Sequence, residues 1–588
     1  MNRFDSAVRS TTLTAVVCHL AVFGSVNRAF SADPRTEVVV RDFSQCLPAT
    51  GLSKTRKRGH WQLISYETDA RTGTMLGAQS LIDAPTVTLP LKLQGWYRIS
   101  LGLWNPVFAY DGKETVVKVK LSKDPCPVII ASVHPGSATS TQFQEYAFKA
   151  ADLTGQDLVI RQRPGQKAYL AYVRFRPLTA EQVAAVKARR TRPENRVIVA
   201  SHDGGGYLNR GGGIAVQSRE DLWAQVERYR WSDVKRVTWA VNYSHTTNWP
   251  SRLGTVFSRE FPPGSRGEQT LFAALNGLLD QGINPLHEVC EHAHRVGIQF
   301  DAQFRMALLG RTPPDHQAGF VHDHPQFRMI TRDGTAVEKA SYAFPETRGF
   351  LLSMLRETAT RIDVDGITLN FIRGGEYVAY EQPVADAFRA AHKMQPQDVQ
   401  RNDPRLQQVR AKFMTQLVQD ARKTLDEIGR KKNKRLKLSV VIYPSLEINM
   451  GHALDVKSWA EAGLIDSIYG GERGAIARLA EATGIDFYPG IGPRNTESYL
   501  GAWNRWHKRD VGYFVWDMDY NVELPHEWAV LSRMGHDEEM QVISDNKSRP
   551  SGILSSEPVV RVGGADVTKL ANQEAGYPQK FLFLFSGG

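Results

Sequence analysis

The sequence predicts an α/β protein of two parts, a (β/α)8 TIM barrel preceded by an all-β sandwich of the jelly-roll type. Three observations support this prediction. Short apolar runs separated by turn residues fill residues 33–178, and strand-like runs alternate with amphipathic helical stretches over residues 196–545. A polar helical segment at residues 179–195 separates the two patterns, so we expect the domain boundary there.

Residues 1–32 have the pattern of a signal peptide. Arg3 and Arg9 give a positively charged start, an apolar run follows at residues 13–26, and small residues then offer a cleavage site. The run is shorter than the roughly 20 apolar residues of a transmembrane helix, and no second run of this kind follows. We therefore expect export to the periplasm or the extracellular space, with no membrane span in the mature chain.

The sandwich prediction for residues 33–178 depends on the spacing of short strands. Turn pairs such as Thr154-Gly155 and Pro164-Gly165 divide them, and no long amphipathic helix interrupts them. We expect strands near residues 95–104, 115–121, 127–133, 142–148, 157–162 and 168–175. A polar helix should then run from Ala180 to about Arg190, with Thr179 as its N-cap.

Residues 196–545 contain eight strand-like runs with helical patterns between most of them. The expected strands lie at residues 197–200, 234–241, 298–304, 366–372, 436–443, 465–469, 486–490 and 512–516. Eight such units match a TIM barrel. A doubly wound sheet is the alternative, and the number of repeats favours the closed barrel. Residues 546–588 contain no further unit and are expected to add a strand or to trail as a tail.

The charge pattern argues against nucleic-acid binding. The 588 residues carry a formal net charge of +11, with basic clusters at residues 54–58 and 430–435. Neither cluster is part of a nucleic-acid-binding motif, so we expect a solubilising loop, a helix C-terminus and no nucleic-acid partner.

Cysteine and histidine spacings predict no cofactor and no metal site. Cys46 and Cys126 could pair in an oxidising compartment, whereas Cys290 lies in a helical pattern and is expected to be a buried thiol. The loop after the third strand contains His316, His322, Asp323 and His324, but their spacing fits no standard metal motif. A metal-dependent enzyme that uses this loop is the weakest alternative.

Candidate site residues lie where the barrel strands end, because active sites of this fold occupy the carboxyl edge of the sheet. Three carboxyls are the candidates for acid–base work: Glu376 and Glu472 in glycine-flanked loops, and Asp517 directly after the last strand. Asp301 could bind a ligand or could pair with Arg305 inside the barrel. The expected ligand-binding residues are Asp203, Asp301, Asn370, Arg373, Tyr443, Tyr488 and Trp516.

Two segments resemble a known family. Residues 344–352 read FPETRGFLL and enter a helix, and residues 363–373 read DVDGITLNFIR. These motifs are similar to those of the glycosyl-hydrolase-like family 10 proteins and related bacterial TIM-barrel glycoside hydrolases. Matching pieces cover most of residues 196–540. One departure is that Asn370 stands where the family has an aspartate, and Thr368 stands at a position that is often acidic.

The resemblance implies a barrel that acts on glycans. We expect an exported glycoside hydrolase of carbohydrate metabolism that cleaves an oligo- or polysaccharide with two carboxyls. One carboxyl would protonate the leaving oxygen, and the other would attack the sugar or activate water. The sandwich is a candidate carbohydrate-binding module. Because of Asn370 and Thr368, the alternative is a non-catalytic glycan-binding protein on a degenerate barrel.

Overall fold

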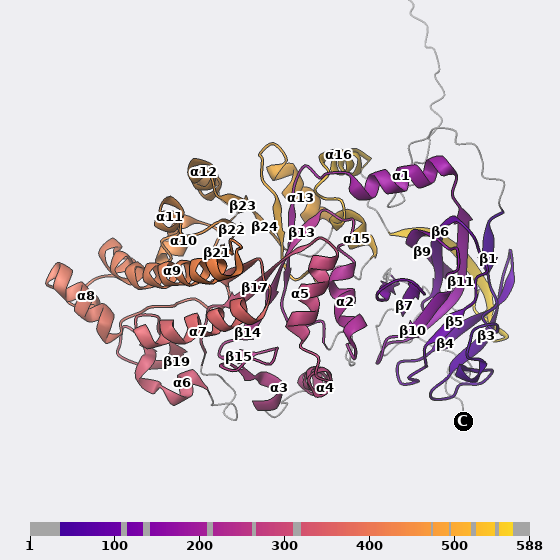
Figure 1. Ribbon diagram of the computed structural model, residues 1–588, viewed down its shortest axis with the longest axis horizontal. Coiled ribbons are helices and arrows are strands. Elements are labelled where there is room, and N and C mark those ends of the chain that lie inside the picture. Colours follow the sequence, from indigo (N-terminus) through magenta and orange to yellow (C-terminus); the bar gives the residue numbers. More distant parts are fainter. Residues whose placement is uncertain are drawn as a thin grey trace, which may run out of the picture.

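A computed structural model describes residues 36–106, 115–132, 142–208, 216–260, 266–309, 319–471, 474–492, 496–518, 525–546 and 552–568. The molecule is elongated, with two antiparallel sheets at one end and a parallel sheet surrounded by helices at the other (Figure 1).

The parallel sheet has nine strands in the order β23-β22-β21-β20-β17-β13-β12-β25-β24. One residue, Pro489, separates β23 from β24, and these two short strands pair with opposite edges of the sheet. The chain at residues 486–491 therefore brings the edges together in a nearly closed sheet, as in a TIM barrel. The strands are β12 (Ile198–His202), β13 (Val234–Ala240), β17 (Gln299–Arg305), β20 (Gly366–Asn370), β21 (Lys437–Ile442), β22 (Ser467–Gly470), β23 (Asp486–Tyr488), β24 (Gly490–Ile491) and β25 (Tyr513–Val515).

These strands lie where the apolar runs of the sequence predict them, because strands covered on both faces need side chains that tolerate burial throughout. Val199, Val441, Tyr469 and Phe514 form one buried cluster contributed by four strands of the sheet. The helices around the sheet include α2 (Arg219–Glu227), α4 (Arg266–Asp280), α5 (Pro285–Arg295), α7 (Pro345–Arg361), α8 (Gln382–His392), α9 (Pro404–Lys432), α11 (Val456–Glu461), α12 (Gly474–Thr483), α13 (Thr496–Trp506), α15 (Pro525–Leu531) and α16 (Asp537–Asn546).

Shorter elements follow several of the strands. They include a small sheet of β14 (Asn242–Tyr243), β15 (Thr246–Thr247) and β16 (Thr255–Val256), and a two-stranded ribbon of β18 (Arg328–Ile330) and β19 (Ala336–Ala340). The short helices are α3 (Phe257–Glu260), α6 (Phe320–Asp323) and α10 (Leu446–Gly451).

Two antiparallel sheets form the other end of the molecule. Their strands include the six predicted from the sequence, and side chains of both sheets belong to one apolar core. The larger sheet contains β1 (Val38–Val40), β2 (Leu52–Ser53), β3 (Trp61–Thr68), β4 (Thr72–Ala78), β6 (Trp96–Trp104), β9 (Gln142–Asp152), β11 (Ala168–Pro177), β26 (Ile553–Val562) and β27 (Ala565–Asp566). The smaller one contains β5 (Val87–Leu89), β7 (Val116–Leu121), β8 (Val128–Ala131) and β10 (Leu158–Gln162).

The helix predicted between the two patterns is α1 (Ala180–Thr191). Thr179 is its N-cap, and the Thr179 hydroxyl accepts a hydrogen bond from the backbone N–H of Gln182. The Gln182 side chain in turn accepts one from the backbone N–H of Thr179, which completes a capping box. The N-cap prediction is therefore confirmed.

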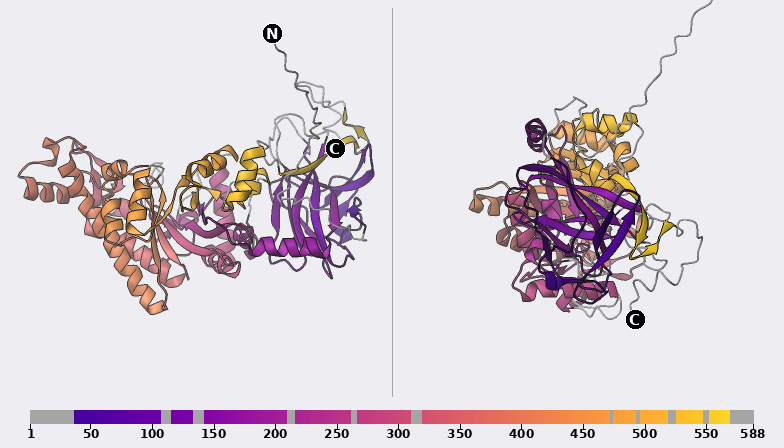
Figure 2. Two further views of the ribbon diagram at one scale, coloured as in Figure 1. Left: turned by 90° about the horizontal axis from the view of Figure 1, so that it is seen from above. Right: turned by 90° about the vertical axis from the view of Figure 1, so that its right-hand side faces the viewer.

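Strand β26 comes from the far end of the chain and completes the larger antiparallel sheet. Its first half pairs with β9 and its second half with β3, so it joins two strands that lie hundreds of residues earlier. Figure 2 shows the yellow β26 alongside the indigo and purple strands. Residues 553–562 are thus an integral strand, one of the two possibilities that the sequence left open for this segment.

Substitution of Val559 should test how much β26 contributes to stability. Val559 is 1% exposed, whereas Ser556 on the same strand is exposed. We expect Val559→Asp to destabilise the antiparallel sheets by at least about 3 kcal/mol, because it buries an unpaired charge. Ser556→Asp is the control and should stay within about 0.5 kcal/mol of the parent. Chemical unfolding followed by circular dichroism measures both; equal unfolding midpoints would show that β26 contributes little.

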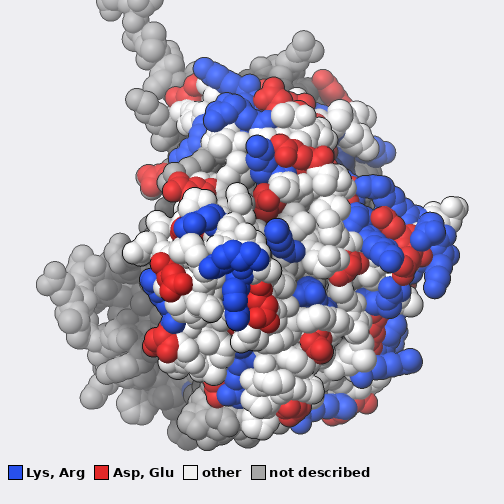
Figure 3. Space-filling view, turned by 90° about the vertical axis from the view of Figure 1, so that its left-hand side faces the viewer, with Lys and Arg blue, Asp and Glu red and all other residues white. Residues whose placement is uncertain are grey.

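The described helices and the surface bear on two further expectations. No helix in the described ranges combines the length and apolar character that a membrane crossing requires. Figure 3 shows the end of the molecule that carries α8 and α11, where basic and acidic side chains are interspersed. The basic excess of the sequence therefore does not form a field of one sign on this face.

Candidate active site

The carboxyl edge of the parallel sheet brings two aspartates and two arginines together. Asp203 follows β12, Arg305 ends β17, Arg373 follows β20 and Asp517 follows β25. Arg305 forms an ion pair with Asp203. Arg373 Nη2 lies 3.4 Å from Asp203 Oδ1 and 3.5 Å from Asp517 Oδ1. Four strands far apart in the sequence thus contribute to one cluster.

Glycines allow the chain after β12 to place Asp203. Gly204 has φ +80°, and a side chain there would meet the Ala240 carbonyl oxygen at 2.1 Å. The Tyr243 hydroxyl donates a 2.9 Å hydrogen bond to the backbone oxygen of Asp203, and the Arg305 guanidinium lies 4.3 Å from the centre of the Tyr243 ring. Asp203 is therefore fixed through its backbone and its side chain.

Asp517 differs from Asp203 in its surroundings. Its backbone is in the left-handed region, at φ 46°, a conformation that aspartate adopts more readily than most residues. Burial raises the pKa of Asp517, and the negative charge of Asp203 raises it further. Arg373 and Arg305 act in the opposite direction, but the raising effects prevail. The Asp517 carboxyl therefore keeps its proton to higher pH than an ordinary aspartate.

Glu376 lies in a second group, three residues beyond Arg373. Arg401 pairs with Glu376 at 2.6 Å. Lys339 of β19 donates a hydrogen bond to the Gly374 carbonyl oxygen, and burial lowers the pKa of Lys339 to about 8. The structure thus brings Asp203, Arg373 and Asp517 together and places Glu376 in an ion pair of its own.

Three predicted aromatic residues line this part of the sheet and are partly buried. The Tyr443 ring stacks on His452 with 4.3 Å between centroids. Tyr488 and Trp516 pack against the buried cluster that contains Tyr469 and Phe514. The Trp516 and Phe514 rings are in edge-to-face contact, with 4.8 Å between their centroids. Each ring therefore has one side packed in the protein and retains some exposed surface.

Asp301 lies away from the cluster. It is the third residue of β17, four residues before the strand ends, and its side chain is fully buried. Its ion-pair partner is Arg236 of β13. The suggested Asp301–Arg305 pair was wrong, because Arg305 lies at the carboxyl edge and contacts Asp203.

Asn370 is also buried, at the last position of β20. Its side-chain oxygen accepts a 3.2 Å hydrogen bond from the backbone N–H of Ile372. The amide therefore shapes the turn that carries Arg373 outward. Glu472 falls outside the described residues, as does His316.

Sequence reasoning did not assign three residues of these two groups to the site: Arg305, Lys339 and Arg401. The position of Arg305 at a strand end was a usable signal. Lys339 had none, because it comes from the β18–β19 ribbon within a long connection.

The residues considered as alternative metal ligands and as a possible disulfide pair have other surroundings. His322 and Asp323 are exposed on α6, and His324 packs against Phe320 with centroids 4.8 Å apart. Cys46, Cys126 and Cys290 are buried free thiols, so Cys46 and Cys126 do not pair in this structure.

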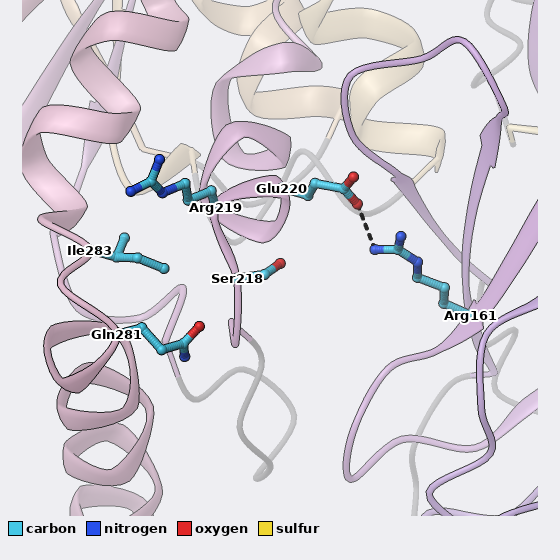
Figure 4. Close-up of a pocket in the computed structure, with 6 residues that line it drawn as sticks. All are labelled: Arg161, Ser218, Arg219, Glu220, Gln281 and Ile283. Carbon is cyan, nitrogen blue, oxygen red and sulfur yellow. Dashed lines mark ion pairs between the residues drawn. The ribbon is translucent and has the colours of Figure 1, made fainter.

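A separate pocket of about 530 Å³ lies between the antiparallel sheets and the helices of the parallel one (Figure 4). Arg161 and Glu220 form a 2.7 Å ion pair across it. Its other lining residues are Ser218, Arg219, Gln281 and Ile283. No member of the carboxylate cluster lines this pocket, so it is distinct from the candidate active site.

A parallel, nearly closed sheet with paired carboxyls at its carboxyl edge is typical of barrel enzymes. Residues 237–471 match the family model of the glycosyl hydrolase-like 10 proteins. This match covers less than half of the chain and confirms the resemblance seen in residues 344–373. It supports a function in glycan chemistry.

Solved structures with similarity to this chain include three glycoside hydrolases. α-L-Fucosidase isoenzyme 2 from Paenibacillus thiaminolyticus is 13% identical, with a TM-score of 0.36 over 60% of this chain and 50% of that one. The PgaB (BpsB) glycoside hydrolase domain from Bordetella bronchiseptica is 11% identical, with a TM-score of 0.40 over 58% and 98%. The GH36 α-galactosidase AgaB from Geobacillus stearothermophilus is 10% identical, with a TM-score of 0.32 over 80% and 63%.

The match to the fucosidase thus spans half of that enzyme's length. A search of curated proteins gives no match.

Proposed function

We propose that this protein is an exported glycoside hydrolase in which Asp517 and Asp203 form the working carboxyl pair. The observation that carries the proposal is the asymmetry of the pair. Both carboxyls contact one arginine, Arg373; Asp203 also pairs with Arg305, whereas burial and the charge of Asp203 raise the pKa of Asp517. Two nearby carboxyls in different environments can take the separate roles of general acid and of base or nucleophile.

In this mechanism, Asp517 donates its proton to the glycosidic oxygen as the bond to the leaving sugar breaks. Asp203 attacks the anomeric carbon or removes a proton from the attacking water. The two Oδ1 atoms are at most about 7 Å apart, because both contact Arg373 Nη2, at 3.4 and 3.5 Å. Retaining enzymes need about 5–5.5 Å and inverting enzymes about 6.5–9.5 Å. Product stereochemistry, followed by NMR, would distinguish them.

Further residues would hold the sugar chain. Trp516, Tyr488 and Tyr443 present partly exposed rings, and sugar C–H faces pack on such surfaces. Arg373 is 42% exposed and can donate hydrogen bonds to hydroxyls. Glu376, with Arg401, would contact a neighbouring sugar unit, and Glu472 stays a candidate carboxyl. Asn370 would act by shaping the turn before Arg373, and we leave Asp301 out of the site.

The remaining assignments are also proposals. Residues 1–32 would direct export. Residues 33–178 would form a jelly-roll-like sandwich that binds carbohydrate, residues 179–195 the linker, and residues 196–545 the catalytic TIM barrel.

Product release from a panel of plant, algal and bacterial polysaccharides tests the activity. The parent protein should release sugar from at least one of them, and Asp203→Asn should release none while keeping its fold. Asp363→Asn changes a carboxyl that is 70% exposed and precedes β20, so it is the matched control and should keep full activity. Release by Asp203→Asn at the parent rate would refute this pair.

The second candidate function is glycan binding without hydrolysis. The observation that favours it is Asn370, which offers a buried amide where the family has a carboxylate. It predicts retention on one immobilised glycan with no product from the parent protein, whatever the pH.

A further inference from the structure

A second cluster of reactive side chains lies where the antiparallel sheets meet the helices of the parallel sheet. Cys126 lies between β7 and β8, Glu227 ends α2, and His292 is on α5. Cys126 and His292 are each 1% exposed, and the Glu227 side chain is 14% exposed. One potential ligand atom from each residue lies within 4.8 Å of the other two.

We propose that Cys126, Glu227 and His292 bind a zinc ion that links the two parts of the molecule. Sulfur, imidazole nitrogen and carboxylate oxygen are the donors that Zn²⁺ takes in proteins. Three protein ligands leave one tetrahedral position for water. This site is independent of the proposed glycan activity, since none of its residues belongs to the carboxylate cluster.

The ligand side chains are already oriented by their neighbours. Arg230, which lies outside the cluster, holds the Glu227 carboxylate by donating a 2.7 Å hydrogen bond to Oε1. The Trp223 ring stacks on the His292 ring at 5.3 Å and 10°. Such supporting contacts are usual around metal ligands, because they fix the ring and the carboxylate.

An independent observation also points to a ligand. His292 Nδ1 is buried and, among the described residues, has no hydrogen-bond partner. A buried polar atom without a partner is costly. A cation bound at Nδ1 would give this atom a partner, and Nε2–H would then donate to the Glu227 carboxylate.

The expected chemistry is loss of the thiol proton on metal binding. Zn²⁺ coordination forms the Zn–S bond, and the proton leaves to solvent. Ligand distances of about 2.0–2.3 Å place tetrahedral ligand atoms about 3.5 Å apart, and the candidate atoms lie within 4.8 Å of one another, so small side-chain movements would bring them to the metal.

Sequence spacing did not reveal this cluster because its ligands come from three separate segments. One is a loop of the small antiparallel sheet, and the other two are helices of the other part of the molecule. The prediction of no metal site depended on local motifs, and this site has none.

Cobalt substitution tests the proposal on the full chain. The purified protein is stripped with a chelator and given one equivalent of Co²⁺. We expect a thiolate-to-cobalt charge-transfer band together with the visible bands of a tetrahedral site, both abolished by Zn²⁺. Cys126→Ala should lack the charge-transfer band and should bind zinc at least about 100-fold more weakly, since even supporting partners are worth about 10–100-fold.

Cys290→Ala is the matched control, because Cys290 is an equally buried thiol on α5 outside the cluster. It should keep the band and the zinc affinity. Absence of a thiolate band in the parent protein would overturn the proposal, as would an unchanged band in Cys126→Ala. Circular dichroism checks that each variant folds. If Cys126→Ala does not fold, the cobalt spectra of the parent protein and of His292→Gln test the proposal instead.

Discussion

Asp517→Asn should lower kcat by about 10²–10⁴-fold, the usual contribution of a general acid, and should leave KM nearly unchanged. The amide keeps the size of the side chain but cannot donate the acidic proton to the leaving oxygen. Initial rates on the polysaccharide that the parent protein cleaves measure the effect. Glu376→Gln, which removes the carboxylate paired with Arg401, should alter KM more than kcat.

The pH profile separates a proton donor from a binding residue. The pKa of Asp517 is raised, so its protonated, active form persists above the pH at which an ordinary aspartate ionises. Activity should therefore be present below that raised pKa and fall as the pH rises through it. Asp517→Asn should lose this alkaline limb. A parent-like rate and profile in the variant would show that Asp517 is not the acid.

Asp301→Leu should destabilise the parallel sheet by about 3–5 kcal/mol, because it leaves the Arg236 guanidinium buried without its counter-charge. Urea unfolding followed by tryptophan fluorescence measures the loss. The double variant Arg236→Met, Asp301→Leu should recover most of it, since two apolar side chains can replace a buried ion pair.

An exposed ion pair provides the control for this prediction. Arg58 and Asp83 lie 3.2 Å apart, with side chains 84% and 54% exposed, so Arg58→Ala should cost less than about 1 kcal/mol. If Asp301→Leu proves as harmless as Arg58→Ala, the buried pair has no structural role. Unchanged stability with a large loss of substrate affinity would instead return Asp301 to the binding site.

Burial made the strands of the barrel predictable from the sequence. A strand covered on both faces needs a continuous apolar run, and such runs occur at the positions of β12 to β25. Strand β26 could be suspected only as an extra strand, since nothing local specifies pairing with β3 and β9.

The sequence indicated which strand ends carry the candidate site residues, but not which of these residues contact one another. The position of Asp517 after the last strand made it a candidate carboxyl, and its neighbour Asp203 was expected to bind substrate. The reach of Arg373 and Arg305 decides which carboxyls share a guanidinium, and side-chain reach depends on tertiary geometry. For Asp301, strand alternation indicates an inward direction but not the depth at which the side chain lies.

Because β26 pairs with both β3 and β9, the larger antiparallel sheet can be completed only after the parallel sheet has been synthesised. During synthesis, β3 and β9 emerge hundreds of residues before the strand that joins them, and the whole parallel sheet is made in between. The edges of β3 and β9 therefore stay open until β26 has been made, and open edges are where chains associate wrongly. Topologically, the barrel is an insertion between strands of a single sheet, so interrupted chains should leave an incomplete sheet even when the barrel has folded.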